Sequence, residues 1–408
     1  MSLLLPGPRL WDIFCRVIDN HGDLGVCWRL ARGLAGAGER VRLWVDEPAA
    51  LAWMAPAGAA GVRLMPWPPA GAGPGTEPDP APASSNANGW PAPGDVVVEA
   101  FGCDPPPAFV AAMAATVPPP VWINLEYLSA EPYAARSHGL RSPQSAGPGR
   151  GLDKWFFYPG FGDQTGGLLH GDRASLSPRA LPERAEWAAA LGLTRPLRLP
   201  AGQPDDLFAN LRHNMPVALP AAERLMLLFG YPQGPWTGLF AALAGQGHWR
   251  LLVPPGGLQD SLAEQALEPP VGLAWQALAA LSQPEFDSLL AGCDLVLVRG
   301  EDSFVRAQLA GDAPFLWQIY AQPDGAHVAK LDAFLALYLA SAAPALARPL
   351  AQLFRAVNGL ADWPQAWPDW ALWQAHQRSW RLAQLARPDL VSALLGFVEQ
   401  HRAAVKAG

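Results

Sequence analysis

Two carboxylates lie four residues apart in a short segment that reads VIDNHGDLG, residues 17–25. Asp19 ends an apolar, strand-like run and Asp23 comes just before a helical pattern, so both are expected at the ligand-binding edge of a parallel sheet. Gly22 and Gly25 allow the chain to turn tightly here. Two acids in this position could orient a cationic acceptor and remove its proton. The alternative is structural, because Asp is also a common helix N-cap and turn residue.

Signatures of other catalytic classes are missing from the sequence. The segment just described is not a GxGxxG fingerprint, because only two of its glycines are present, so a dinucleotide cofactor is poorly supported. There is no P-loop and no GxSxG elbow. His21, His138 and His327 lie far apart and show no zinc spacing. We therefore expect neither a metal nor a cofactor.

A second motif, VRGEDSFVRAQ at residues 298–308, is suited to binding an anion. Arg299 ends a predicted strand, and Asp302 and Ser303 are expected to cap the helix that follows, whose free N–H groups favour an anion. An Arg beside such a helix start suits a diphosphate, and Glu301 or Asp302 could accept hydrogen bonds from sugar hydroxyls. The alternative is an ordinary capped helix with an Arg–Glu pair on its rim.

Two further groups of side chains stand near predicted strand ends. Aromatic and amide side chains that could hold a nucleobase by stacking and hydrogen bonding are Phe229, Tyr231, Gln283 and Phe286. Taken singly, such residues are more often part of a core or a surface. Residues that could line a cleft in the first half of the chain are Asn20, Gly22, Asn124, Glu126 and Tyr127. Glu126 could equally be a structural ion-pair partner.

The elements that must position these residues alternate between strand and helix. In the first half we expect strands over residues 11–19, 40–48, 94–102 and 120–128 and a helix over 26–38, whereas 151–169 is expected to be irregular. A second set begins near Leu225, with strands at 225–231, 249–256, 294–300 and 313–320 and helices at 235–245, 284–293 and 301–311. The stretch after about residue 350 is expected to be helical. This alternation predicts an α/β protein with parallel sheets.

The two sets predict two Rossmann-like domains that face each other across a cleft, the architecture of GT-B glycosyltransferases. We expect an N-terminal domain over residues 1–184 and a C-terminal domain over residues 185–384. A C-terminal helix at about 385–408 is expected to pack back on the first domain. The stretch at about 55–94 is rich in Pro, Ala, Gly and Ser, and its low-complexity part at 68–94 is expected to be a surface loop. Fold alone does not decide function.

Composition excludes several classes of partner and compartment. The 408 residues are 50% hydrophobic and 16% charged, which suits a folded two-domain protein, and a net charge of −7 gives no reason to bind nucleic acid or an anionic membrane. We see no signal peptide and no apolar run long enough to span a membrane. The four cysteines, without CxxC spacing, are expected to be reduced and buried. We therefore expect a cytoplasmic protein.

Four segments together resemble one known family, the elongation factor P arginine rhamnosyltransferases. They are FCRVIDNHGDLGVCWRLARGLA, INLEYLSAEPY, KWFFYPGF with the nearby QTGGLL, and CDLVLVRGEDSFVRAQLAG. The resemblance spans roughly residues 11–320, and the RGEDSFVRAQ run is its most specific part. It implies a metal-independent, inverting GT-B enzyme that transfers L-rhamnose from dTDP-β-L-rhamnose to one arginine, at a loop tip in the N-terminal domain of elongation factor P. It also implies that the N-terminal domain binds the acceptor and the C-terminal domain binds the donor.

The resemblance also implies roles for individual residues. The paired acids fall on Asp19 and Asp23. The donor contacts fall on Phe229, Tyr231, Gln283, Phe286, Arg299, Glu301, Asp302 and Ser303. The chain departs from the family where Ala280 stands in place of a frequent aromatic residue, which puts one side of the base-stacking contact in doubt. His21 also replaces a frequent aromatic residue, and the Pro-rich insert looks longer than usual.

A mechanism follows from these implied roles. A guanidinium is a poor nucleophile while protonated, so we expect Asp23 to act as general base and Asp19 to hold the guanidinium, with the roles open to sharing. Arg299 and the helix start at Asp302–Ser303 are expected to stabilise the leaving diphosphate. The alternatives are a nucleotide-sugar-binding GT-B protein that acts on another acceptor or lacks transferase activity, and an NAD(P)-dependent dehydrogenase.

Overall fold

The computed structural model describes residues 7–18, 21–67, 90–171, 223–264 and 270–407 of the chain. The chain forms two compact units, the first made of residues 1–171 and 384–408 and the second of residues 172–383. The domain boundary expected at residue 184 falls within 172–222, outside the described residues.

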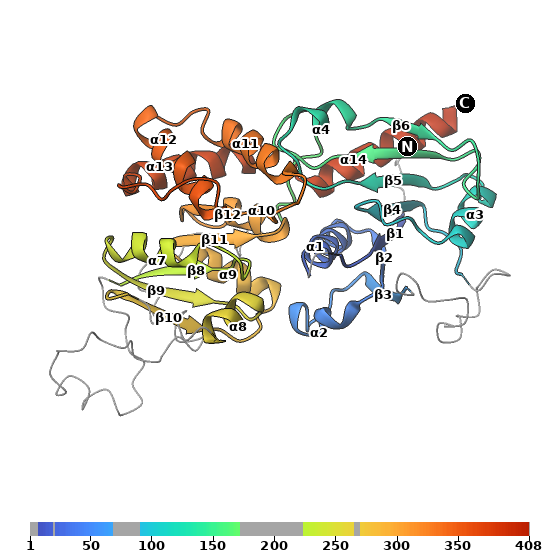
Figure 1. Ribbon diagram of the computed structural model, residues 1–408. Helices are drawn as coiled ribbons and strands as arrows, with labels where there is room; N and C mark the ends of the chain where they lie inside the picture. Colours follow the sequence, from blue (N-terminus) through green and yellow to red (C-terminus); the bar gives the residue numbers. More distant parts are fainter. Residues whose placement is uncertain (1–6, 19–20, 68–89, 172–222, 265–269, 408) are drawn as a thin grey trace. The chain divides into compact units, whose positions relative to one another are not determined.

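The first unit is built on a seven-stranded sheet with the order β3-β2-β1-β4-β5-β7-β6 (Figure 1). All neighbouring strands are parallel except β6 and β7. The strands are β1 (Leu10–Cys15), β2 (Arg40–Val45), β3 (Val62–Pro66), β4 (Val96–Ala100), β5 (Val121–Leu125), β6 (Arg141–Pro143) and β7 (Asp153–Phe157). The helices are α1 (Gly22–Gly36), α2 (Leu51–Met54) after the short turn η1 (Pro48–Ala50), α3 (Pro107–Ala115), α4 (Pro132–Ser137) and α14 (Leu390–Ala407).

Both faces of this sheet are buried, which explains why its central strands are apolar throughout. Successive side chains of a strand point to opposite faces, so Ile13 belongs to the core that α1 and α14 cover, while Phe14 belongs to the core that α3 covers. Helix α1 supplies Cys27, Leu30 and Leu34 at helical spacing to the first core. Leu30 and Leu34 are fully buried, and each burial contributes about 2 kcal/mol.

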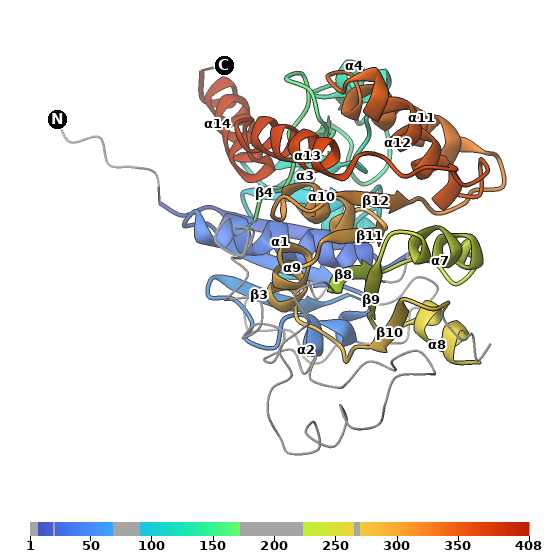
Figure 2. The ribbon, with the colours of Figure 1, turned by 90° about the vertical axis from the view of Figure 1, so that its left-hand side faces the viewer.

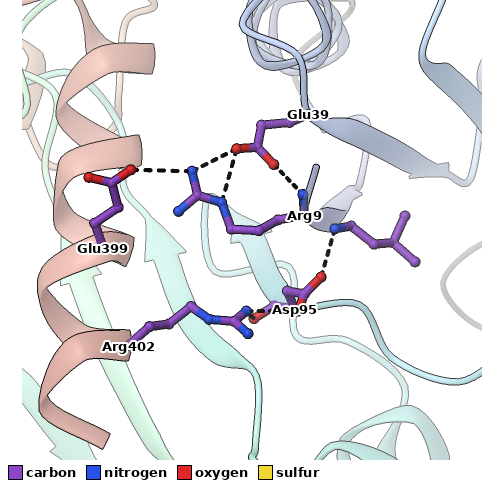
Figure 3. A network of polar contacts seen from close by, with 6 residues as sticks. Arg9, Glu39, Asp95, Glu399 and Arg402 are labelled. Atoms are coloured by element: carbon purple, nitrogen blue, oxygen red, sulfur yellow. Dashed lines mark hydrogen bonds and ion pairs between the residues drawn. The ribbon is translucent and has the colours of Figure 1, made fainter. Parts of the chain in front are cut away.

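The C-terminal helix α14 is tied to the sheet of the first unit by polar contacts as well as by its apolar face. Figure 3 shows Arg402 of α14 donating to Asp95 Oδ1 at 2.8 Å, while the other oxygen, Oδ2, accepts the Leu10 N–H at 2.9 Å. Arg9 donates to Glu39 Oε1 at 2.6 Å and lies 3.8 Å from Glu399 of α14. These contacts lie where β1, β2 and β4 begin, at the edge opposite the carboxyl ends of the strands.

The second unit has a five-stranded, fully parallel sheet with the order β10-β9-β8-β11-β12. Figure 2 shows these strands one above another, with β10 at the bottom and β12 at the top. The strands are β8 (Glu223–Leu228), β9 (His248–Val253), β10 (Leu273–Ala277), β11 (Leu295–Arg299) and β12 (Phe315–Gln318). The helices are α7 (Trp236–Ala244), α8 (Gly257–Glu264), α9 (Gln283–Gly292), α10 (Asp302–Leu309), α11 (Ala326–Tyr338), α12 (Pro344–Val357) and α13 (Trp370–Leu385). In both units, the first three strands along the chain are added from the centre of the sheet toward one edge, and the next two are added toward the other edge. This order of strands is the Rossmann pattern.

The structure corrects two expectations about the first unit. The strand expected over residues 11–19 ends at Cys15, because the N–H groups of Val17 and Ile18 donate to the carboxylates of Asp46 and Asp23 and pair with no strand. The segment expected to be irregular contains β7, which pairs in parallel with β5. The glycine-rich sequence around β7 does not predict a strand, because β7 is defined by its pairing with β5, which lies far from it along the chain.

Candidate active site

The point where the strand order reverses in the second unit lies between β8 and β11, and an arginine occupies it. Arg299 is the last residue of β11, as expected, and its guanidinium carbon lies 4.9 Å from the ring centre of Phe229 and 4.7 Å from that of Tyr231. Both rings belong to the loop after β8. A planar cation held against two aromatic rings is fixed in place before any ligand binds.

The chain turns from Arg299 directly into the start of α10. Gly300 has a φ of +66°, a conformation that favours glycine, and α10 begins at Asp302. The capping that the sequence predicted for Asp302 and Ser303 is wrong. Glu301 is the N-cap without a side-chain cap bond, Asp302 lies in the first turn, and the Ser303 hydroxyl donates to the Arg299 carbonyl. The first turn of α10 therefore presents backbone N–H groups beside Arg299, a suitable site for an anion.

The remaining predicted donor contacts come from α9. Phe286 is half-buried, and its ring meets that of Phe229 edge to face with centres 5.5 Å apart. Gln283, the first residue of α9, is buried. The helix start is fixed by a reciprocal cap in which Ser282 and Glu285 each bond the other's backbone N–H. The structure therefore brings Phe229, Tyr231, Phe286 and Arg299 together; we call these four residues the aromatic–arginine cluster.

Two supporting contacts of this cluster were not foreseen. Gln318 at the end of β12 accepts the Tyr231 N–H on Oε1 at 2.7 Å, which fixes the loop after β8. Arg306 of α10 and Asp287 of α9 form a buried ion pair, with bonds of 3.1 Å to Oδ1 and 2.9 Å to Oδ2. This pair joins the helix that carries Phe286 to the helix that begins beside Arg299. The position of Gln318 at a strand end is a signal that sequence reasoning could have used.

In the first unit, Asp23 lies in the first turn of α1 and not just before the helix as expected. It is 4% exposed, and its Oδ2 accepts the Ile18 N–H at 3.1 Å. That bond closes the loop after β1 over the start of the helix, beside the point where the strand order reverses between β1 and β4. Gly22 begins α1, whereas Asp19 and Asn20 lie outside the described residues.

A second polar group follows β5 at the same edge of this sheet. Asn124 accepts the Gly102 N–H at 3.2 Å and donates to Glu126 Oε1 at 2.8 Å. Burial raises the pKa of Glu126, and the bond from Asn124 and the charge of Lys154 offset this only in part. Nearby, the rings of Phe101 and Tyr127 stack with centres 4.3 Å apart.

The two parallel sheets and their ligand-binding edges define the class of protein. The fold is that of a GT-B glycosyltransferase, an α/β enzyme with two Rossmann-like units. The chain belongs to the family described as elongation factor P (EF-P) rhamnosyltransferase EarP, whose model matches residues 11–399.

Relatives and a solved structure agree with this assignment. The chain is 41% identical over 412 residues to a protein-arginine rhamnosyltransferase of Pseudomonas putida, covering 95% of this chain and 98% of the relative. A protein of the same name from Pseudomonas aeruginosa is 37% identical, with the same coverage. A structure described as the basis for EarP-mediated arginine glycosylation of EF-P matches with a TM-score of 0.59 and 30% identity, over 96% of this chain and 99% of that one. In the described part of the chain, no helix has the length and apolar character needed to cross a membrane.

Proposed function

We propose that this enzyme transfers L-rhamnose from dTDP-β-L-rhamnose to an arginine side chain of translation elongation factor P, with inversion at the anomeric carbon. The family and the names of the relatives support rhamnose and the arginine acceptor. The observation that carries the donor part is the aromatic–arginine cluster beside the start of α10. Rings of this kind suit a thymine, and a guanidinium next to free N–H groups suits a diphosphate.

The proposed reaction forms one bond and breaks one. A guanidinium nitrogen of the acceptor attacks the anomeric carbon from the face opposite the diphosphate, so a β-linked donor gives an α-linked product. The bond between the anomeric carbon and the diphosphate oxygen breaks, and its electron pair leaves with dTDP. Asp23 takes the proton that the nitrogen loses, and Asp19 holds the guanidinium. Arg299 and the first turn of α10, with Asp302 and Ser303, stabilise the negative charge that grows on dTDP.

The division of labour between the units is also part of the proposal. The first unit, with its carboxylates, takes the basic acceptor, and the second unit, with Gln283 and Glu301 beside the cluster, takes the donor base and sugar. The proposed reaction belongs in the cytoplasm, where elongation factors act. All four cysteines are buried and free, which fits a reducing compartment.

One assay tests this function directly. Purified enzyme is incubated with dTDP-β-L-rhamnose and elongation factor P, and the acceptor is then analysed by mass spectrometry. We expect one added deoxyhexose, located on one arginine. An enzyme that is stabilised against heat by dTDP but leaves elongation factor P unmodified would be a nucleotide-sugar-binding protein with another acceptor or without transferase activity.

A further inference from the structure

One carboxylate at the ligand-binding edge of the first unit has no task in the mechanism above. Glu126 follows β5, is half-buried, and uses Oε1 to accept a bond from Asn124. Burial raises the pKa of Glu126 and the charge of Lys154 partly offsets this, but the Lys154 ammonium bonds Glu99 at 2.7 Å and lies 3.8 Å from Asp104. Among the described residues, no ion pair reaches Glu126. Its second oxygen is therefore free to bind a ligand.

The direction of this carboxylate is set by a relay of hydrogen bonds. The Gly102 N–H donates to the oxygen of the Asn124 side chain, so the amide NH₂ group must point to Glu126. The relay begins next to a strained residue, because Phe101 has a φ of +58°, which is rare for a bulky side chain. The Phe101 N–H donates to the Leu125 carbonyl at 2.7 Å, which holds that conformation. Backbone strain of this kind is concentrated at functional sites.

Aromatic rings occupy the loops that follow the neighbouring strands. Phe101 and Tyr127 stack at 4.3 Å with an angle of 13°, and Tyr133 meets Tyr158 edge to face at 5.8 Å. Tyr127 is 37% exposed and Tyr133 is 40% exposed, so part of each side chain reaches solvent. Burial first, and then the charge of Glu126, raises the pKa of Tyr158, so this phenol lies within electrostatic range of the carboxylate. A carboxylate among partly exposed aromatic side chains has the chemistry that binds a guanidinium or an ammonium group.

From this arrangement, and resting on the proposed function, we infer that Glu126, Tyr127 and Tyr158 form a subsite for a basic side chain of the acceptor protein. The occupant is a second cation, next to the arginine that is modified. The loops after β1 and β5 are separated by β4, which places them two strand spacings apart, or about 10 Å. That separation favours a separate cation at Glu126, while Asp23 serves the reacting arginine.

The test compares Glu126→Gln with Glu131→Gln. The second variant makes the same chemical change in the same loop, where the Glu131 carboxylate bonds the Ser129 hydroxyl. Steady-state kinetics are measured with elongation factor P and dTDP-rhamnose at several salt concentrations, together with the melting temperature. For Glu126→Gln we expect the acceptor KM to rise roughly tenfold, because one charge-assisted hydrogen bond to the acceptor is lost. The kcat and the donor KM should not change. The acceptor KM of the variant should also depend less on salt than that of the wild type.

A structural role predicts a different result. If Glu126 only stabilised the fold, its replacement would lower the melting temperature and the salt dependence would stay as in the wild type. An unchanged acceptor KM, or a fall in kcat alone, would overturn the subsite. Tyr127→Leu gives a second measurement, because loss of the ring face should raise the acceptor KM a further few-fold without changing donor affinity. A wild-type enzyme that transfers nothing to elongation factor P would instead refute the proposed function.

Discussion

The two candidate regions differ in how their residues are held. In the second unit, Arg299 already lies against two rings, and α9 and α10 are joined by a buried ion pair. In the first unit, Asp23 is bonded to the backbone of its own loop, and Glu126 keeps one oxygen without a described partner. The second unit resembles a preformed small-molecule site, whereas the first resembles a surface that a partner completes.

This difference follows from the ligands proposed for each region. A nucleotide sugar is small, so its site must supply most of the contacts and gains affinity when the protein holds them in advance. A protein acceptor brings its own folded surface, so the enzyme needs a few charged groups at defined positions. Substitutions in the second unit should therefore change the affinity for dTDP, whereas substitutions in the first unit should change the acceptor KM or kcat.

The largest effect is expected from Asp23→Asn. Loss of the general base should lower kcat by about 10²–10⁴-fold, while the affinity for dTDP stays unchanged because the second unit is intact. Single-turnover transfer and calorimetric titration with dTDP measure the two quantities. Asp104→Asn is a suitable control, because its side chain is 86% exposed and should tolerate the change. Normal transfer by the Asp23 variant would show that another group takes the proton.

Substitutions of the buried ion pair between Arg306 and Asp287 test whether the donor site of the second unit is preformed. Asp287→Leu alone leaves a buried guanidinium without its carboxylate and should lower the free energy of unfolding by about 3–5 kcal/mol. The double variant Arg306→Met, Asp287→Leu should regain most of that stability, because an apolar pair of similar volume has no charge to bury. Denaturant titration measures both.

Donor affinity of the double variant then decides the role of the pair. If the pair sets the distance between Phe286 and the start of α10, dTDP should bind roughly tenfold more weakly although the protein is stable. Equal dTDP affinity in the wild type and in a stable double variant would mean that packing alone positions the two helices.

The contacts in the two units also show which features can be predicted from the sequence and which cannot. The Arg299 strand end, the following helix and the four buried cysteines were predictable because each depends on residues close together in the chain. The contact of Gln318 with Tyr231 joins positions 87 residues apart, and only the order of strands in the sheet brings them together. The missed strand β7 has the same cause, because its partner β5 lies some thirty residues earlier. The start of α10 was misjudged by one residue, since caps depend on backbone angles that composition does not fix.

A smaller effect is expected from Arg299→Ala, which removes one cation from the proposed diphosphate site. Loss of charge-assisted hydrogen bonds should weaken dTDP binding about 10–100-fold, and binding of elongation factor P without donor should not change. Arg348→Ala, at an exposed position of α12, serves as the control. If the calorimetric affinity for dTDP were unchanged, Arg299 would not belong to the diphosphate site. The second unit would then not have a donor site preformed around Arg299.

The smallest effect is expected at the amino-terminal edge of the first unit, where α14 is attached. Burial alone would raise the pKa of Asp95, but the Leu10 N–H and the Arg402 guanidinium outweigh it, so the pKa lies below its ordinary value. A carboxyl with a lowered pKa in the folded state stabilises the fold above its unfolded pKa, near 4, and loses that contribution as the pH falls through the folded value. Because the pair is partly exposed, Asp95→Asn should cost only about 0.5 kcal/mol at pH 7.

Thermal melts of the wild type and Asp95→Asn across a pH series check this expectation. The difference in melting temperature should be about 1–2 °C at pH 7 and should disappear below about pH 3. Transfer activity at pH 7 should match the wild type, because the site lies at the opposite edge of the sheet from Asp23. A variant that keeps its melting temperature but loses acceptor binding would link α14 to the acceptor surface. The first unit would then transmit changes between its two edges, and its carboxylates would depend on the rest of the unit as closely as Arg299 depends on its neighbouring rings.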